Sequence, residues 1–221
     1  LTKLEHRYAG FDGLNLTWET LEGIAKHNGP LRGALTPTLA NYVKQHDLEL
    51  ASWPSAEAQV AALADDIAYD NHDTDDGLRA GLFAIADLAE VPLLGPAFAE
   101  VDRLYPGIEE SRRIHEAIRR LIDRMIGDVL AESQRRIAGL KARSAADIRR
   151  HSGAVIAFST DMREQERGLR RFLFERMYRH YRVNRMASKA RRVVQELFRL
   201  LHSEPQCLPT EWQSQASGAG T

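Results

Sequence analysis

Apolar residues recur at helical spacing along most of this 221-residue chain. After Trp53-Pro-Ser55, a start signal, the apolar positions repeat every three or four residues as far as about Asn71 and predict an amphipathic helix. The same spacing predicts longer helices over 108–132, 162–178 and 184–201. Alternating runs typical of strands are nearly absent, so the pattern predicts an all-α fold.

Shorter elements are indicated by capping and turn residues. Thr17 is placed to cap a short helix, and Asn28-Gly-Pro30 is placed to end it, which puts Lys26 and His27 at a helix C-terminus. Weak periodicity between 138 and 159 predicts a connection with short helices. The last residues are small and polar, and we expect a disordered tail over 213–221.

Composition and charge exclude several classes of protein. Thirty Lys and Arg nearly balance 31 Asp and Glu, so no overall field attracts nucleic acid or an anionic membrane. The single cysteine, Cys207, excludes an internal disulfide and a multi-cysteine zinc site. Because no apolar run approaches the ~18 residues that span a bilayer, we expect a soluble, cytoplasmic protein without a membrane segment.

An acidic segment is the strongest candidate for chemistry. Six aspartates fall within residues 64–79, and Asp65, Tyr69 and Asp73 stand four residues apart. If the helix continues through Asp73, these three side chains share one face, since each step of four residues turns by only ~40°. Such a face suits a hard divalent cation or the hydroxyls of a sugar. On periodicity alone the pattern is more typical of a solvated acidic surface, and it leaves both interpretations open.

A family resemblance extends this interpretation. Residues 54–79 resemble the segment of bacterial deoxyguanosine triphosphate triphosphohydrolases that supplies the last metal ligand, and residues 8–23 and 172–180 resemble later blocks of that family in the same order. The resemblance runs to about Trp212. It implies the C-terminal portion of an HD-domain-type helical bundle over 1–135, with additional C-terminal helices over 136–212.

The resemblance also implies roles for four residues. Asp65 matches a metal-ligating aspartate, Tyr69 a tyrosine that packs against the deoxyribose, and Asp73 an aspartate that accepts from its 3'-hydroxyl. Lys26 resembles a lysine that meets the triphosphate. The implied activity is hydrolysis of a deoxynucleoside triphosphate, dGTP or another dNTP, to deoxynucleoside and inorganic triphosphate with Mg²⁺ or Mn²⁺.

The chain also departs from the family pattern. The other expected metal ligands, a His and a His-Asp pair, and the catalytic His-Glu elements belong upstream of Leu1, and Leu1-Thr-Lys-Leu-Glu5 resembles a helix interior, which predicts a missing N-terminal part. We interpret His46-Asp47 and His72-Asp73 as coincidental pairs. The chain alone is therefore expected to hold no catalytic residue, to bind metal only feebly and to be inactive. The alternative is a catalytically incomplete nucleotide-binding or oligomerisation module.

An arginine-rich segment bears on partners. Eight arginines lie within residues 163–185, beside Tyr178 and Tyr181. This composition is compatible with single-stranded nucleic acid or an allosteric nucleotide, but it favours a structural role or an oligomer interface. The resemblance likewise implies a homo-oligomer. Missing upstream helices would leave apolar surface exposed, so we expect the chain to associate.

Overall fold

The computed structural model describes residues 1–2 and 4–216, and in this part of the chain the fold is all-α, as predicted. Its elements are α1 (Trp18–Ala25), α2 (Pro37–Val43), α3 (Ala56–Arg79), η1 (Ile85–Leu88), α4 (Leu94–Leu104), α5 (Glu110–Leu140), α6 (Ala145–Arg150), α7 (Thr160–Leu173), η2 (Phe174–Tyr178), α8 (Tyr181–Ser203), η3 (Pro205–Cys207) and α9 (Thr210–Ala216). The predicted N-cap is confirmed, since Thr17 accepts from the Thr20 amide. At the second start signal, Ser55 caps α3 by accepting from the Ala58 amide.

Helix α3 extends two turns beyond its predicted end near Asn71. Asn71 and Thr74 are buried, and their side chains donate back to the carbonyls of Ile67 and Asp70 one turn earlier. Gly77 continues the helix under the Phe83 ring, where an added Cβ would stand 2.3 Å from a ring carbon. The packed side of these last two turns carries polar and small residues. Apolar periodicity therefore did not predict that the helix continues.

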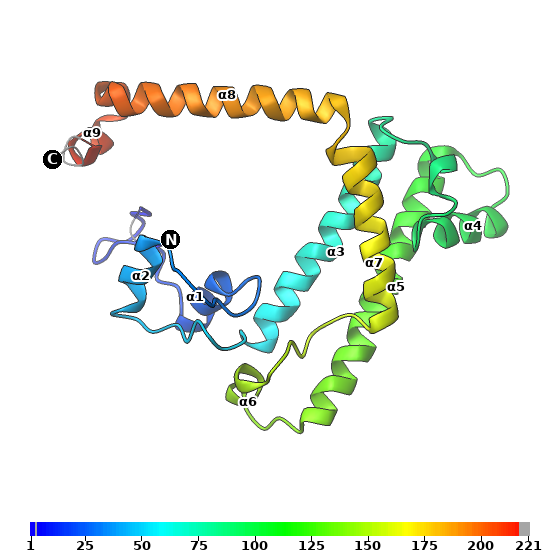
Figure 1. Ribbon diagram of the computed structural model, residues 1–221, viewed down its shortest axis with the longest axis horizontal. Coiled ribbons are helices and arrows are strands. Elements are labelled where there is room, and N and C mark those ends of the chain that lie inside the picture. Colours follow the sequence, from blue (N-terminus) through cyan, green and yellow to red (C-terminus); the bar gives the residue numbers. More distant parts are fainter. Residues whose placement is uncertain (3, 217–221) are drawn as a thin grey trace.

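Four helices enclose the main core. Helix α5 buries Ile114, Ala117, Leu121 and Met125 against α3 and α4, and α7 adds Leu169 and Leu173. Figure 1 shows α3, α5 and α7 crossing through the centre, with α4 on the far side of α5. Helix α4 begins at Leu94 and accommodates Pro96, because Pro96 falls in its first turn, where no intrahelical amide hydrogen bond is lost.

The predicted division at residue 135 falls inside α5. Core residues come from both sides of it, since Phe158, Met162 and Leu169 pack in the same cluster as Ile67 and Leu121. A smaller cluster of Ile148, Val155 and Ile156 also packs against residues from before 136, namely Ala56, Leu63 and Val129. Residues 213–216, where disorder was expected, complete α9, and 217–221 lie outside the described residues.

The chain after α7 is arranged differently. Helix α8 lies apart from the central helices and joins them through η2 (Figure 1), and none of its 23 residues is buried. No helix in the described part of the chain combines the length and apolar character needed to cross a membrane.

Candidate functional site

The acidic face of α3 is formed as the spacing required. Because α3 continues to Arg79, Asp65, Tyr69 and Asp73 follow one another along the same side of one helix. The Asp65 side chain is 71% exposed and Tyr69 is 60% exposed, whereas Asp73 is half-buried. The face is therefore open at Asp65 and partly enclosed at Asp73.

Asp65 has few partners. Its Oδ2 lies 3.7 Å from Nε2 of His27, which is about half exposed. Within the described residues, no group of three or more His, Cys, Asp or Glu side chains is arranged to hold a metal ion. The exposed Asp65 carboxylate can supply one ligand to a divalent cation.

Tyr178 closes the other end of this face. The chain after α7 forms a π-helical turn, η2, in which the Arg179 amide donates to the Phe174 carbonyl five residues earlier. At the end of that turn the Tyr178 hydroxyl donates to Oδ2 of Asp73. Burial, together with the negative charge of Asp73, raises the pKa of Tyr178 above its ordinary value, so the hydroxyl stays a neutral donor.

Tyr178 was not among the site residues predicted from the sequence. The residue lies 105 positions from Asp73. The available signal was its place in the block 172–180, one of the three that carried the family resemblance.

A charged cluster beside this face joins α7 to α3. Arg170 lies 2.9 Å from Asp66 and 3.1 Å from Asp70, and it also pairs with Glu166 on its own helix. Asp70 is only 3% exposed. Burial, with Glu166 and Asp66 adding negative charge, raises the pKa of Asp70 to about 6 although Arg170 opposes the shift.

Lys26, expected to meet the triphosphate, is fully buried at the end of α1. Its Nζ lies 2.7 Å from Glu22 and donates to Ser52 Oγ and to the carbonyls of Glu49 and Trp53. Arg149 holds the same Glu22 carboxylate with two hydrogen bonds of 2.7 Å. In this conformation Lys26 cannot reach a phosphate, and it anchors the loop between α2 and α3.

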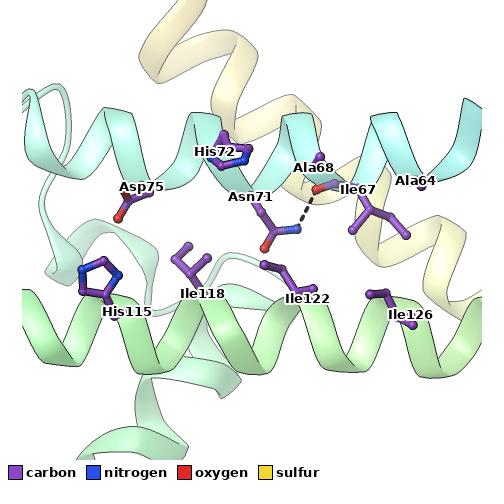
Figure 2. Close-up of a pocket in the computed structure, with 10 residues that line it drawn as sticks. All are labelled: Ala64, Ile67, Ala68, Asn71, His72, Asp75, His115, Ile118, Ile122 and Ile126. Carbon is purple, nitrogen blue, oxygen red and sulfur yellow. Dashed lines mark hydrogen bonds between the residues drawn. The ribbon is translucent and has the colours of Figure 1, made fainter. Parts of the chain in front are cut away.

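A groove of about 390 Å³ lies between α3 and α5, on the side of α3 away from α7. Figure 2 shows isoleucines of α5 along the groove, with Asp75 and His115 at one end and Asn71 near the middle. Asn71 is 2% exposed and its Oδ1 has no hydrogen-bond partner, nor does Oδ1 of Asp75. The remaining lining residues are Ala64, Ile67, Ala68, His72, Ile118, Ile122 and Ile126.

The two His-Asp dipeptides do not converge on Asp65. The His46 ring packs against Tyr42 at 5.0 Å between centroids, and Asp47 accepts from the Glu49 amide. His72 lines the α3–α5 groove, whereas its neighbour Asp73 accepts the hydrogen bond from Tyr178 of η2. Neither pair is placed with Asp65 as a shared ligand set within the described residues.

The C-terminal part of the chain matches a known domain family. Residues 156–221 match the family described as the phosphohydrolase-associated domain, which begins just before α7 and includes η2 and α8. The C-terminal helices are therefore similar to that domain family.

Curated relatives define the family more closely. A deoxyguanosinetriphosphate triphosphohydrolase-like protein of Parvibaculum lavamentivorans is 57% identical over the whole chain. Proteins with the same name from Cereibacter sphaeroides and a Bradyrhizobium species are 52% and 51% identical over 99% and 100% of it. Over its length the chain is thus a homologue of the deoxyguanosinetriphosphate triphosphohydrolase-like proteins. It spans 57–58% of the length of these relatives.

Proposed function

We propose that this chain forms the deoxyribose side of the active site in a dNTP triphosphohydrolase, an enzyme that converts dGTP or another dNTP to deoxynucleoside and inorganic triphosphate. One observation carries the proposal. Helix α3 presents Asp65, Tyr69 and Asp73 on one face, and Tyr178 is hydrogen-bonded to the last of them. The names of the relatives support the same reaction class.

Each side chain has a chemical task in this proposal. Tyr69 offers an exposed flat ring on which a sugar packs. Asp73 accepts a hydrogen bond from the 3'-hydroxyl, and the Tyr178 hydroxyl holds the carboxylate in place for it. The two ends of the face then separate the sugar, near Asp73, from the phosphates, near Asp65.

A divalent cation, Mg²⁺ or Mn²⁺, would take Asp65 as one ligand and supply charge to the phosphate end. Because the described residues contain no group of three potential ligands, its other ligands would come from outside this chain. We accordingly propose that the 221-residue chain is inactive alone. The second candidate, a catalytically incomplete nucleotide-binding or oligomerisation module, is favoured by the same lack of a ligand group.

Other expected partners stay predictions. A cytoplasmic location and a homo-oligomer fit an enzyme of nucleotide metabolism. The arginine-rich segment gives less support to nucleic acid or an allosteric nucleotide, because several of its members are engaged within the chain: Arg170 with three carboxylates, Arg176 with Asp87, and Arg179 over the Phe174 ring.

The test compares this chain with a fusion that adds the part of the Parvibaculum lavamentivorans relative that it does not span. Both are incubated with each dNTP and Mg²⁺ or Mn²⁺, and released triphosphate is measured. We expect turnover only in the fusion. In the fusion, Asp65→Asn should lower kcat/KM by more than ~100-fold. Substituting a residue that only hydrogen-bonds to a metal ligand already lowers metal affinity or activity by about 10–100-fold.

Two further variants locate the sugar. Asp73→Asn should lower kcat/KM by roughly 10- to 100-fold, the usual value of a hydrogen bond to a charged group. It should also reduce the ratio of kcat/KM for a dNTP to kcat/KM for its 3'-deoxy analogue. Asp76→Asn, an exposed carboxylate of the same helix, is the matched control. Turnover by the short chain, or an Asp65→Asn fusion with full activity, would contradict the proposal.

A further inference from the structure

Helix α8 is the longest helix in the described chain that buries none of its residues. Six large apolar side chains on it are between 42% and 67% exposed: Met186, Val193, Val194, Leu197, Phe198 and Leu200. Its main contacts are with η2 and η3, the segments adjacent to it in the chain. In Figure 1 it extends away from the central helices, and among the described residues its apolar side chains stay largely exposed.

The spacing of that face is that of a paired helix. The seam residues, named here for the line that they form, follow one another at alternating steps of three and four: Val183, Met186, Ala190, Val193, Leu197 and Leu200. Three heptads of this kind are typical of a helix that packs along a second helix. Ala190 in the seam and Ala187 beside it have small side chains, which allows two helices to approach closely there.

Charge favours one orientation of the second helix. Helix α8 carries six Arg and Lys residues and one acidic residue, Glu196. Beside the seam stand Arg182, Lys189 and Glu196, one per heptad. If a second copy of α8 runs antiparallel with its seam in register, Lys189 lies opposite Glu196 of the second copy, and the pair occurs twice by symmetry.

A parallel arrangement lacks these pairs. The N-terminal halves of the two helices, which carry five basic residues between Arg182 and Arg192, would lie side by side, and Lys189 would lie opposite Val194. We therefore propose that α8 pairs antiparallel with α8 of a second copy of this chain, through the seam residues and two Lys189–Glu196 ion pairs. The inference is independent of the proposed activity, because no residue of the α3 face takes part.

The first test is sedimentation equilibrium of the 221-residue chain over a wide concentration range. We expect a monomer–dimer equilibrium. Leu197→Glu places a charge in the seam and should raise the dimer Kd by roughly 30-fold or more, as loss of a central apolar contact does. Gln195→Glu adds the same charge on the outer side of α8 and should leave Kd unchanged. The proposal is overturned if the chain stays monomeric, or if Leu197→Glu leaves the dimer Kd unchanged.

Charge exchange tests the orientation. Lys189→Glu and Glu196→Lys should each raise the dimer Kd by roughly tenfold, because each converts two attractive pairs into two repulsive ones. Mixing the two single variants, or combining them in one chain, should restore association. Arg192→Glu, the same charge change away from the seam, is the control. Equal weakening by Arg192→Glu, or no rescue on mixing, contradicts the antiparallel pair.

Cys207 provides a native probe of the same point. It is exposed and lies four residues beyond the end of α8. A parallel pair would bring the two thiols together, whereas an antiparallel pair separates them by about 34 Å, the length of a 23-residue helix. We expect no Cys207–Cys207 disulfide on mild oxidation of the dimer. Rapid disulfide formation that Leu197→Glu abolishes would show parallel pairing, and binding of α8 to anionic vesicles without self-association would show a lipid occupant; either result overturns the proposal.

Discussion

Helices α5 and α8 carry similar patterns and have opposite surroundings. Both are long, amphipathic and rich in arginine, and both were predicted from the spacing of their apolar residues. Yet α5 buries Leu121 and Met125 completely under α3 and α4, whereas α8 buries nothing. The pattern thus specifies that a helix has an apolar face, but it does not specify what covers that face.

The difference separates two kinds of stability. Substitutions in the covered part of the molecule should lower the free energy of unfolding of a single chain. Substitutions in the α8 seam should instead change association and leave the single chain almost as stable as before.

Glu22→Gln should have the largest effect on folding. Burial would by itself raise the pKa of Glu22, but the hydrogen bonds from Arg149 and Lys26 hold it below its ordinary value, so the carboxylate is charged. Removing that charge leaves Lys26 fully buried beside the Arg149 guanidinium. Loss of one partner from such a group costs about 3–5 kcal/mol of unfolding free energy. Urea unfolding followed by circular dichroism measures the loss, with Glu19→Gln, exposed on the same helix, as the control; equal stabilities would show that the group is not formed.

Leu121→Ala should come next, since it truncates a fully buried side chain at the centre of α5. The expected loss is about 3 kcal/mol, within the usual range for a leucine whose cavity does not collapse. The same urea titration measures it. Leu130→Ala, at a position of α5 that is 57% exposed, is the matched control and should cost much less. Similar losses at both positions would mean that α5 is not packed as described.

Asp70 should make the covered part sensitive to pH. Its pKa is raised from 3.8 to about 6, because burial, with Glu166 and Asp66, disfavours its charge. The folded chain therefore holds this proton more tightly than the unfolded chain. The resulting stability is fully present below about pH 4 and is lost as the pH rises through 6, by up to roughly 3 kcal/mol.

Asp70→Asn should remove this dependence. Unfolding free energies measured from pH 4 to pH 7 should fall less steeply for the variant than for the parent chain. Since Glu166 also has a raised pKa and remains in both proteins, only the difference between their slopes reports on Asp70. Asp76→Asn should keep the parent slope. If the unfolding free energies of Asp70→Asn and of the parent chain change equally with pH, Asp70 is charged throughout this pH range and the assigned burial is wrong.

The same contrast explains what the sequence could predict. Periodicity and caps placed α1, α3, α5, α7 and α8 because these are local properties of each segment. The face of Asp65, Tyr69 and Asp73 followed for the same reason, once α3 was known to continue. Contacts between distant segments did not follow. The Tyr178–Asp73 hydrogen bond depends on a π-helical turn and on the packing of α7, and neither has a local signature.

Lys26 shows the same limit from the other side. At the end of a short helix, a lysine is locally indistinguishable from one that faces solvent or a phosphate. Its burial results from Glu22, Arg149 and the carbonyls of the loop before α3, which only the tertiary structure brings together. The family resemblance therefore identified the position but could not reveal its surroundings in this chain.

Leu197→Ala should have the smallest effect on folding and tests the comparison most directly. The residue is 53% exposed in the single chain, so truncation at low protein concentration should change the unfolding free energy by no more than about 0.5 kcal/mol. At high concentration, where α8 pairs with a second copy, the same substitution should lower the apparent stability further, since association stabilises the folded state by mass action.

Leu121→Ala provides the contrast for this last measurement. Its cost arises within one chain, so it should be similar at low and high protein concentration, while that of Leu197→Ala should grow with concentration. Unfolding curves at two concentrations a hundredfold apart separate the two cases. If Leu197→Ala destabilises the dilute chain as strongly as Leu121→Ala does, α8 is covered by its own chain in solution, and the division between a packed core and an unpaired helix fails.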